Sequence, residues 1–325
     1  MMIVILILLG IVLILFTYLT IRFKSGKRKA ELHWQHSNIQ KMHNLGTVQF
    51  CQIIPLIDWY TSREALKGEA GVSYLIETDN VSILFDVGFN MKQTDPSPLI
   101  NNMKQLGITM DDFDTIVISH NHLDHVGGMK WQRQRTFSLA NQQIDLGEKT
   151  VYTPIPMTYP GLSPILSKNP TVISEGVTTI GTIANQDFFS GWIEEQALAI
   201  NMKGKGILLI VGCGHQTLPK ILMRAESLFE EPIYGIIGGL HYPVTASRIK
   251  IMGINMQKYI GICRPPWSPI TIDAVKENID LLKKRNPGVV ALSAHDSCDE
   301  SIAAFKNAFP AIYKEVKVGE RIVIQ

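Results

Sequence analysis

The first twenty residues form an almost unbroken apolar run, MMIVILILLGIVLILFTYLT, and a basic segment follows it directly. A helix needs roughly 20 apolar residues to cross the hydrocarbon core of a bilayer, so the run predicts a transmembrane helix over residues 1–21. A secretory signal would carry basic residues before its apolar run and a small-residue cleavage site after it, and this chain shows neither feature. We therefore expect an uncleaved anchor, and a cleaved signal with a periplasmic domain is the alternative.

Residues 22–46 are basic and polar, and we expect them to form a juxtamembrane linker. Basic residues that follow a single span favour the cytoplasm for the rest of the chain, which predicts a single-pass membrane protein with its main domain on the cytoplasmic side. The linker holds His33, His36 and His43, but no cysteine and no cluster of carboxylates accompanies them. We interpret these three histidines as solvated side chains rather than metal ligands.

From residue 47 to 325, short β-branched runs alternate with turn residues and amphipathic segments, a pattern that is typical of an α/β domain. Two halves of this kind predict two sheets packed face to face, with helices on the outside. The expected strands are residues 48–57, 72–78, 81–88, 114–120, 151–157, 171–176, 197–202, 206–213, 233–241 and 289–295. The expected helices are residues 97–107, 218–229 and 272–287, and a loop rich in proline and glycine is expected over residues 158–170.

Composition narrows the class of protein only a little. The 325 residues are 46% hydrophobic and 18% charged, which fits one large globular domain or two small ones. The formal net charge is +2, and no basic stretch is interleaved with aromatic residues, so nucleic acid is not an expected partner. The four cysteines are not closely paired and predict no disulfide framework. The chemistry must therefore be inferred from the candidate site, and a small molecule is the expected substrate.

The stretch ISHNHLDHVGG, residues 118–128, concentrates three of the nine histidines within six positions. His120 and His122 are two residues apart at the end of an expected strand, so their imidazoles share a side if the backbone stays extended. Asp124 and His125 fall in the turn that follows. Imidazole and carboxylate together are the usual ligands of zinc and similar divalent metals. A histidine-rich surface turn is the alternative, and we disfavour it because burying several ionisable groups without a partner is costly.

The other histidines outside the linker, His215, His241 and His295, each end an expected strand. The carboxyl ends of buried strands converge at one edge of a sheet, where sites are commonly built. A single histidine in such a place is more often an ordinary packed residue, but three with the same placement favour a shared site. Cys213, two residues before His215, is either a thiolate ligand or a buried thiol that only packs, and we favour packing.

The segment HNHLDH, which follows FDVG at residues 85–88, resembles the HxHxDH signature of the metallo-β-lactamase fold superfamily. The blocks EAGVSYLIET, ILFDVG, SHNHLDHVGGM, EEQALAI, IVGCGH, IYGIIGGLH and SAHDSC resemble, in order, the branch similar to 7,8-dihydropterin-6-yl-methyl-4-(β-D-ribofuranosyl)aminobenzene-5'-phosphate synthase. The resemblance covers nearly all of residues 47–325. It implies an α/β fold, a four-layer αββα sandwich with a dinuclear metal site at the edge between the sheets, here preceded by one transmembrane helix.

The resemblance also implies a ligand set. His120 and His122 would hold the first metal, Asp124 and His125 the second, and His295 matches the last ligand histidine. The chain departs from the superfamily pattern because no histidine lies between His125 and His215, and because VGCGH stands where many relatives carry a bridging aspartate. His215 is the first candidate to replace the missing ligand and Cys213 the second. The expected occupancy is therefore one or two metal ions.

Roles for the remaining candidates follow from their positions. Asp124 is expected both to ligate and to orient the nucleophile. His241 is expected to lie beside the ligands or to donate a proton to the leaving oxygen, with ordinary packing as the alternative. Asp86 is expected to brace the metal loop by hydrogen bonds, and Glu195 is expected to be a surface acid rather than a cavity residue. The segment 242–268 is long for a connection and is either a lid or a membrane contact; its cations Arg248, Lys250 and Arg264 are candidates to meet a phosphate.

Together these features predict three regions: a transmembrane anchor (1–21), a linker (22–46) and a metallo-β-lactamase-fold catalytic domain (47–325). The predicted function is a membrane-anchored, metal-dependent hydrolase that uses a metal-activated water on a phosphoester, ester or lactone. The expected cofactor is Zn²⁺, one or two ions, with Mn²⁺ and Fe²⁺ as alternatives. A transferase similar to the dihydropterin synthase and a non-catalytic binding module with a degenerate metal site are the competing functions.

Overall fold

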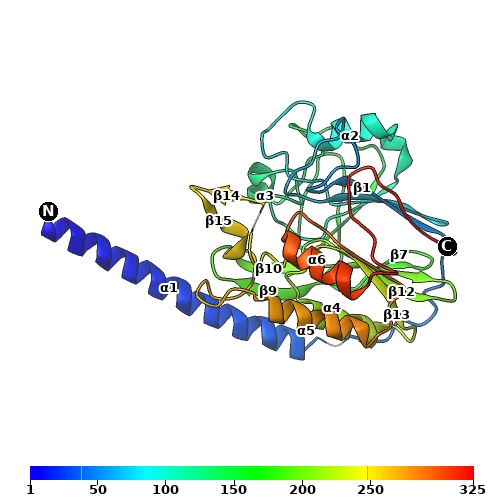
Figure 1. The fold of residues 1–325 in the computed structure, drawn as a ribbon. Coiled ribbons are helices and arrows are strands. Elements are labelled where there is room, and N and C mark those ends of the chain that lie inside the picture. Colours follow the sequence, from blue (N-terminus) through cyan, green and yellow to red (C-terminus); the bar gives the residue numbers. More distant parts are fainter. Residues whose placement is uncertain (38, 247) are drawn as a thin grey trace.

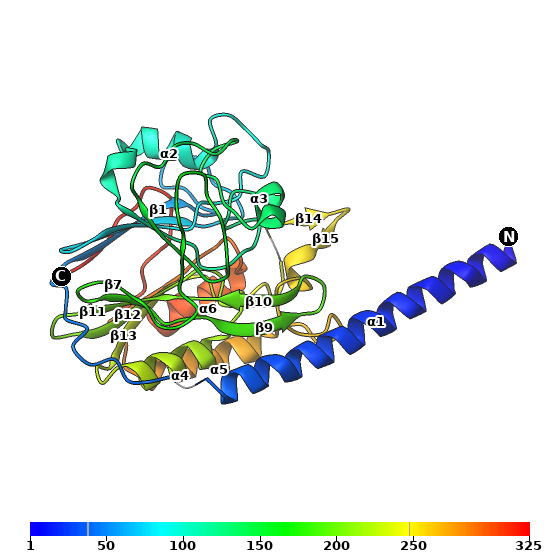
Figure 2. The ribbon, with the colours of Figure 1, turned by 180° about the vertical axis from the view of Figure 1, so that it is seen from behind.

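The computed structural model describes residues 1–37, 39–246 and 248–325. Within these ranges two large mixed sheets lie face to face (Figures 1 and 2). The first has the order β17-β1-β2-β3-β4-β5-β6, with bounds Ile322–Ile324, Cys51–Ile57, Ser73–Thr78, Ser82–Phe85, Thr115–Val117, Thr150–Thr153 and Ile165–Leu166. The second has the order β16-β13-β12-β11-β8-β7, with bounds Val289–Leu292, Ile233–Gly238, Gly206–Val211, Leu198–Met202, Val177–Thr179 and Val172–Ser174.

Helices cover the outer faces of both sheets and give four layers (Figure 1). Helices α2 (Pro98–Leu106) and α3 (Met129–Gln134) lie on the side of the first sheet. Helices α4 (Leu218–Leu228), α5 (Ile272–Lys283) and α6 (Asp299–Ala308) contribute to the core beside the second sheet. Short 3₁₀ turns occupy Met110–Asp112 and Met256–Lys258. This arrangement confirms the αββα sandwich that the sequence predicts.

Three hydrophobic clusters fill the spaces between these layers. The cluster between the sheets is built from inward-facing residues of both, such as Ile53, Phe85 and Ile210, each fully buried. One of the other two clusters holds side chains of the first sheet with α2 and α3, and the other holds side chains of the second sheet with α4, α5 and α6. Because the central strands are covered on both faces, they read in the sequence as nearly continuous apolar runs.

The parallel ladders decide where functional side chains can meet. In the first sheet β3, β4, β5 and β6 are parallel, and in the second β12, β13 and β16 are parallel. The carboxyl ends of parallel strands lie at one edge of their sheet, and the loops that leave them carry the histidine motifs. The expected strands that carry those motifs form as predicted, but each ends before its histidine, so that strand 114–120 becomes β4 (Thr115–Val117).

Two hairpins that were not among the expected strands flank this edge. Strands β9 (Ile183–Asp187) and β10 (Gly191–Glu195) form one, and the short strands β14 (Lys250–Ile251) and β15 (Ile254–Asn255) form the other. Both lie at the end of the sandwich from which α1 projects (Figures 1 and 2). Helix α6 and strand β17 were not predicted either.

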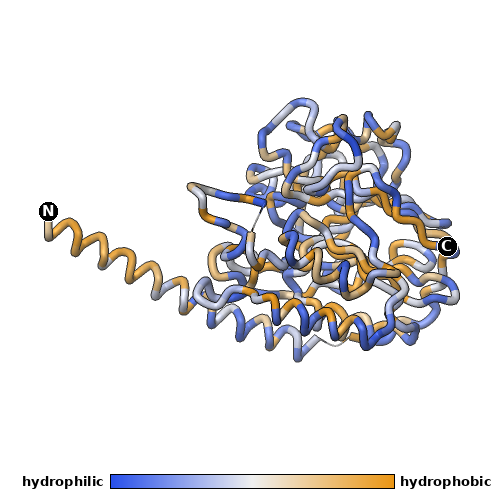
Figure 3. Tube along the Cα trace, in the orientation of Figure 1, coloured by the Kyte–Doolittle hydropathy of each residue, from blue (hydrophilic) through white to orange (hydrophobic). Residues whose placement is uncertain are grey.

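Helix α1 (Met2–Gln35) is one continuous helix that crosses the expected boundary at residue 21. Its N-terminal part projects from the body and is uniformly apolar, whereas its C-terminal part alternates in polarity and lies along the sandwich (Figure 3). It contains an 18-residue window of mean hydropathy 3.1 that is not buried, which makes it a candidate membrane span by length and composition. Phe23 and Ala30, by contrast, are buried against the body, so much of the expected linker is part of the folded domain.

Candidate metal centre between the two sheets

Five predicted histidines meet at the edge between the sheets. His120, His122 and His125 come from the loop after β4, His215 from the loop after β12 and His295 from the loop after β16. The ring centroids are 4.6 Å apart for His120 and His122 and 4.9 Å for His120 and His215. The corresponding distance is 5.4 Å for His125 and His295. The two halves of the chain therefore bring their imidazoles to one place, as the sequence predicts.

Hydrogen bonds fix the tautomer of His120. The Ser119 hydroxyl donates to Asp86 Oδ2 at 2.6 Å, so its oxygen must accept the bond that joins it to His120 Nδ1 at 2.9 Å. The proton of a neutral His120 therefore sits on Nδ1, and its Nε2 presents a lone pair. Asp86 also accepts from the Ser119 backbone N–H and lies 2.7 Å from His125 Nδ1. This is the bracing role that the sequence suggests for Asp86.

The second half of the site repeats this arrangement with a residue that sequence reasoning missed. The Ser293 hydroxyl donates to Asp58 Oδ2 at 2.5 Å and accepts from His295 Nδ1 at 2.6 Å. Asp58 is fully buried at the end of β1 and also accepts from the backbone N–H groups of Trp59 and Ala294. A carboxylate that ends a strand was the available signal, but nothing local links Asp58 to a serine 235 positions away.

The free nitrogens of these rings are the feature that calls for a metal. The Nε2 atoms of His120, His125, His215 and His295 are buried and hydrogen-bond to no atom of the described residues. His215 Nδ1 must donate to the Gly261 carbonyl 2.6 Å away, so its Nε2 is also left with a lone pair. A buried polar atom without a partner costs about 1–3 kcal/mol. Four such atoms in one place fit a divalent ion, which accepts imidazole lone pairs.

The electrostatics agree with neutral ligands. Burial, followed by repulsion between neighbouring imidazoles, holds the pKa values of His120, His215 and His295 well below the usual range. Burial also lowers the pKa of His122 to about 4. His125 differs: burial disfavours its charged form, but the carboxylates of Asp86 and Asp124 outweigh burial and raise its pKa to about 9. A metal bound to His125 Nε2 would replace the proton of the charged ring and would take its place as the positive charge beside Asp124.

The lowered pKa values of these imidazoles predict that their contribution to the stability of the metal-free protein falls as the pH falls from about 6.5 to about 4. In that window an unfolded histidine binds a proton, whereas His120, His122, His215 and His295 stay neutral in the fold, with a pKa of about 4 for His122. The unfolded state then binds more protons, which lowers stability by up to about 1.4 kcal/mol per pH unit for each imidazole. Thermal unfolding in mild detergent with a chelator, at several pH values, measures this effect.

His125 does not offset this loss. Its raised pKa contributes stability that is complete below the unfolded value of about 6.5 and is lost only as the pH rises through about 9. Two buried carboxyls act in the opposite direction over the same window, because the pKa values of Asp58 and Glu195 are raised to about 6 and about 7. The imidazole contribution is therefore measured as the difference in acid dependence between the wild type and His122→Gln. Identical acid dependence of the two melting temperatures would contradict a neutral buried His122.

Cys213 occupies a different place from the one that sequence reasoning favours. Its side chain is buried, and its sulfur lies within 4.8 Å of the ligand atoms of His120 and His215 and also of those of His125 and His295. A thiol that only packed would face the hydrophobic core, whereas this one faces both histidine pairs. Burial, followed by the nearby Asp296 carboxyl, raises the pKa of the thiol well above its usual range. A metal ion is the kind of partner that would make it a thiolate.

His241 lies beside the cluster with both ring nitrogens engaged. Its Nδ1 is 3.3 Å from Cys213 Sγ, and its Nε2 is 3.2 Å from the Ile260 carbonyl. Its backbone is in the left-handed region, at φ 53°, and its N–H donates to Asp296 Oδ2 at 2.8 Å. A left-handed backbone in a residue other than glycine costs of order 1–3 kcal/mol and is common at functional sites. Cys213, His241 and Asp296 form a third group that could hold a cation.

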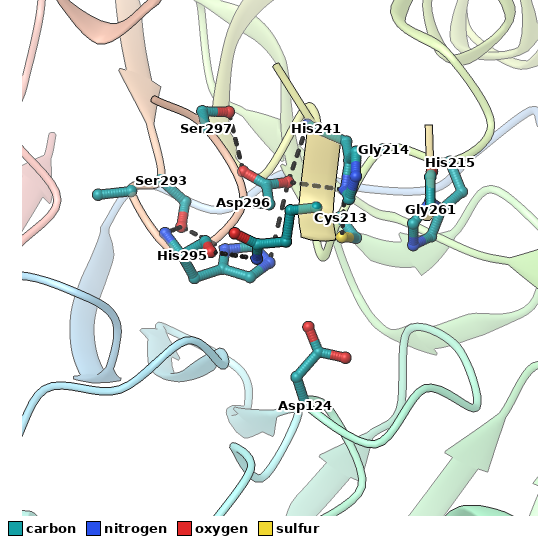
Figure 4. Close-up of polar contacts among 12 residues, drawn as sticks. Asp124, Cys213, Gly214, His215, His241, Gly261, Ser293, His295, Asp296 and Ser297 are labelled. Carbon is teal, nitrogen blue, oxygen red and sulfur yellow. Dashed lines mark hydrogen bonds and ion pairs between the residues drawn. The ribbon is translucent and has the colours of Figure 1, made fainter. Parts of the chain in front are cut away.

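The two remaining acidic residues of the site have distinct positions. Asp124 is partly exposed, lies 3.7 Å from His125 Nε2, and points its carboxylate toward His295 and Cys213 (Figure 4). Glu195 is fully buried and accepts from the backbone N–H groups of Cys213, Gly214 and His215, so the expectation of a surface acid was wrong. Burial raises the pKa of Glu195 to about 7 despite these donors.

Arg248 is not available for a substrate phosphate. Its guanidinium donates to the carbonyls of Ala294 and Ser297 and to Asp299 Oδ1 at 2.7–2.9 Å, which holds the loop after β16 in place. Lys250 and Arg264 are exposed and remain candidates to bind a substrate phosphate. Among the histidines of the expected linker, His33 packs its ring on Trp192, with centroids 5.5 Å apart.

Ser293→Ala is expected to weaken metal affinity by about 10–100-fold, because ligand histidines depend on the partner that orients them. Without the hydroxyl, His295 Nδ1 loses its acceptor and Asp58 loses one donor. A competition titration of zinc against a chromophoric chelator measures the change. Ser138→Ala is a matched control, since Ser138 is equally buried and its hydroxyl bonds, within the described residues, only to the Ala140 and Gln142 carbonyls. Equal affinities in the two variants would contradict the orienting role.

Comparison with known proteins agrees with this geometry. Residues 66–137 match the sequence profile of the family described as the metallo-beta-lactamase superfamily. The chain is 24% identical over 263 residues, 67% of its own length and 87% of the relative, to 7,8-dihydropterin-6-methyl-4-(beta-D-ribofuranosyl)-aminobenzene-5'-phosphate synthase of Methanocaldococcus jannaschii. A local match of 61 residues, 41% identical, covers 18% of this chain and 10% of the transcription termination factor FttA of Cenarchaeum symbiosum.

Among solved structures, the fold is similar to that of Tm1679, described as a metal-dependent hydrolase of the beta-lactamase superfamily. The TM-score is 0.55 at 20% sequence identity, and the superposition covers 84% of this chain and 98% of the other. At this level of identity the similarity establishes the fold.

Proposed function

Because this chain belongs to the metallo-β-lactamase fold superfamily, we propose that it is a membrane-anchored, metal-dependent hydrolase of a phosphoester, ester or lactone. The observation that carries the proposal is the set of four buried Nε2 atoms that hydrogen-bond to nothing in the described residues. His120, His215 and His295 are neutral imidazoles whose other nitrogen is already fixed, which suits them to bind a metal, and His125 would exchange its proton for the metal. A binding module with a degenerate site would have no need to keep these rings oriented.

The geometry supports two neighbouring metal positions. His120, His122 and His215 would hold one ion, and Asp124, His125 and His295 would hold the other, with Cys213 facing both. Imidazole, carboxylate and thiolate donors together suit Zn²⁺ best. Mn²⁺ is a weaker fit because it prefers oxygen ligands, and Fe²⁺ accepts imidazole but generally binds such sites less tightly than Zn²⁺. Bound divalent ions would lower the pKa of a coordinated water and polarise the substrate's carbonyl or phosphoryl oxygen.

The chain's own residues would handle the protons. Asp124 is a partly exposed carboxylate of the site and would orient the attacking water and accept a hydrogen bond from it. His241 Nε2 donates to the Ile260 carbonyl, so its Nδ1 can receive the proton that Cys213 releases 3.3 Å away. His241 would then supply a proton to the leaving oxygen. Glu195 and Asp58 would keep the loops that carry the ligands rigid.

We further propose that residues 1–21 anchor the protein, that residues 22–46 join the anchor to the domain, and that residues 47–325 form the catalytic domain. The apolar, unburied window of α1 supports an anchor. The cations that follow it, Arg22, Lys24 and Lys27, favour the cytoplasmic side for the domain. A cleaved signal is the alternative, and the buried contacts of Phe23 and Ala30 speak against removal of this helix.

The full chain, purified in detergent, tests the function. We expect one to two equivalents of zinc by elemental analysis and hydrolysis of at least one of three probes: bis(p-nitrophenyl) phosphate, an acyl homoserine lactone and p-nitrophenyl acetate. Metal without hydrolysis of any probe would favour a transferase, the activity named for the M. jannaschii relative. Absence of metal would favour a binding module and overturn the proposal.

Cys213→Ser is expected to abolish a sulfur-to-metal charge-transfer band in the cobalt-substituted protein and to lower metal affinity. The reason is that Cys213 Sγ lies within 4.8 Å of both histidine pairs, and a hydroxyl is a much poorer ligand than a thiolate. The near-ultraviolet absorption of the Co²⁺ form measures the band. Cys263→Ser is the matched control, because Cys263 is also buried but belongs to none of the metal-binding groups. An unchanged spectrum in Cys213→Ser would mean that the thiol only packs.

A further inference from the structure

Exposed aromatic side chains surround the point where α1 meets the body. Phe189, in the turn between β9 and β10, is 43% exposed, and Trp267 is 57% exposed. The ring of Phe16 on α1 lies 5.6 Å from that of Trp267 and 6.2 Å from that of Phe188. Phe188 in turn contacts Phe189 and Trp267, at 5.0 and 5.5 Å between ring centroids. We call Phe16, Phe188, Phe189 and Trp267 the aromatic collar.

The β14–β15 hairpin adds a second apolar projection at the same end of the molecule. Met252 at its tip is 96% exposed, and Ile254 is 55% exposed. The hairpin and the apolar part of α1 project from the same end of the sandwich (Figures 1 and 2). Exposing hydrophobic side chains of a hairpin tip to water is energetically unfavourable. Such exposed apolar surface often marks a site of contact with a partner or a membrane.

The charges on α1 set the depth of the collar in a membrane. Arg22 is the first charged residue after the apolar run, and a charge is costly inside the hydrocarbon region. Phe16 precedes it by six residues, about 9 Å along the helix at 1.5 Å per residue. Arg22 also donates to the carbonyls of Phe188 and Phe189 at 2.8 and 2.9 Å, so that turn lies level with it. If α1 spans a bilayer, the collar must therefore lie at the interface, where tryptophan is favoured.

Hydrogen bonds connect α1 and the collar segments to the metal centre. Lys27 Nζ donates to Asn185 Oδ1 at 2.7 Å, and Asn185 Nδ2 donates to the His215 carbonyl at 2.6 Å. Asp187, one residue before Phe188, accepts from the N–H groups of Gly261 and Cys263. The Gly261 carbonyl is the acceptor of His215 Nδ1. The membrane helix and a metal ligand are thus held by the same strand, β9.

Gly261 shows how closely the segment before Trp267 covers the site. Its φ is 83°, and a Cβ added there would lie 2.8 Å from His241 Cε1 and 3.1 Å from His215 Cε1. Only glycine allows this approach. The backbone that covers the histidines therefore continues, within six residues, into the collar.

Two cavities border the site. Each is lined by a residue that lies close in sequence to a residue of the aromatic collar. One, of about 340 Å³, reaches His122 and is lined by Arg135, Ser190 and Trp192. The other, of about 320 Å³, reaches His215 and His241 and is lined by Arg264. Ser190 follows Phe189 directly, and Arg264 precedes Trp267 by three residues. Each cavity offers a cation to an anionic group next to a ligand histidine.

We propose that the aromatic collar and the tip of the β14–β15 hairpin rest in the membrane interface, and that the substrate is an amphiphile of that membrane with an anionic phosphoester head group. The head group would enter beside the β9–β10 turn while its chains stay in the bilayer. This inference rests on the anchored hydrolase proposed above. Water is the only co-reactant: its oxygen bonds to phosphorus, the P–O ester bond breaks, and the alcohol leaves with a proton.

The first test measures the depth of Trp267 in the full chain reconstituted into phosphatidylcholine vesicles. Phosphatidylcholine brominated on its acyl chains should quench the fluorescence of Trp267, read as the difference between the wild type and Trp267→Phe. Equal quenching of the two proteins would overturn the proposal. So would a stable dimer in detergent whose Trp267 is shielded from brominated lipid, because a second copy would then cover the collar.

The second test compares two substrates with the same leaving group. One is a phosphatidyl lipid that carries a p-nitrophenyl phosphodiester head, presented in vesicles, and the other is bis(p-nitrophenyl) phosphate in water. In the double variant Phe189→Ser, Trp267→Ser, the ratio of kcat/KM for the lipid to that for the soluble ester should fall about tenfold or more, because two interfacial aromatic anchors are lost. Met223→Asp, an exposed apolar residue on α4, is the control and should leave the ratio unchanged.

The outcomes separate the two proposals. Hydrolysis of the soluble ester with an unchanged ratio in the double variant would overturn the membrane-facing surface and leave the hydrolase proposal intact. Absence of hydrolysis of both esters by a zinc-loaded wild type, together with no hydrolysis of the lactone and acetate probes, would overturn both.

Discussion

The double variant Asp124→Ala, His125→Ala is expected to lose close to one equivalent of bound metal and to lose hydrolysis by more than the roughly 10–100-fold that changes beyond the ligands cost. The two side chains lie 3.7 Å apart at Oδ2 and Nε2. His125 forms a candidate metal-binding group with His295 and Cys213, and the Asp124 carboxylate points toward the same two residues (Figure 4). Their removal leaves that ion with two protein donors, fewer than the three that catalytic zinc sites keep. Elemental analysis and the steady-state rate on the best soluble probe measure the two losses.

The fold should survive this change, because Asp86 keeps both of its hydrogen bonds from Ser119 and neither mutated side chain belongs to the hydrophobic cluster between the sheets. The matched control is Asp111→Ala, His43→Ala, which removes the same two residue types from exposed positions. The control should keep full metal content and rate. If the site variant also retained both, these residues would not be ligands and the assignment of the second metal position would be wrong.

His215→Ala is expected to lose metal and activity, whereas His241→Ala is expected to keep its metal and lose mainly kcat. His215 Nε2 is one of the four buried nitrogens that hydrogen-bond to no atom of the described residues, while both nitrogens of His241 are already engaged. The loss for His215→Ala should exceed 100-fold, because a direct ligand matters more than its supports. A proton donor typically contributes about 10²–10⁴ to the rate, which sets the expected loss in kcat for His241→Ala.

The pair is informative because the two rings are neighbours, with centroids 5.0 Å apart. A shared packing effect would make the two variants alike. Elemental analysis separates ligand from non-ligand, and the pH profile of kcat should lose its high-pH limb in His241→Ala if that ring donates the proton. Loss of metal in His241→Ala would instead place it among the ligands, in the group with Cys213 and Asp296.

Local pattern was sufficient for some parts of this structure. The apolar run of α1, the strands that end at histidine motifs and the helix α2 could be predicted because each depends on neighbouring residues. Helix α2, for example, starts after Ser97, whose side chain accepts from the Ile100 N–H, and ends at Gly107, which has a left-handed φ of 72°. The expected histidines of the site also meet, because parallel strands place their carboxyl ends at one edge of each sheet and the two edges lie side by side.

Other parts could not be predicted from local pattern. Asp58 and Ser293 are 235 residues apart and act as one unit only because β1 and β16 end at the same edge between the packed sheets. Glu195 looked like a surface acid because it belongs to an acidic pair, Glu194 and Glu195, but its hairpin folds against the VGCGH loop and buries it. The sequence suggests that Arg248 could bind a phosphate, but its guanidinium donates hydrogen bonds to the Ala294 carbonyl and to Asp299, in and just after the loop that follows β16.

The sequence by itself determined the types of ligand, their order along the chain, the sandwich of two sheets and the apolar helix that precedes it. Only the tertiary structure decided that Cys213 faces both histidine pairs, that Asp58 orients His295, and that α1 continues past residue 21 to join β9. The physical reason is the range of each interaction. Backbone geometry and hydrophobic periodicity act over a few residues, whereas the distances in the site depend on how two sheets from distant parts of the chain pack together.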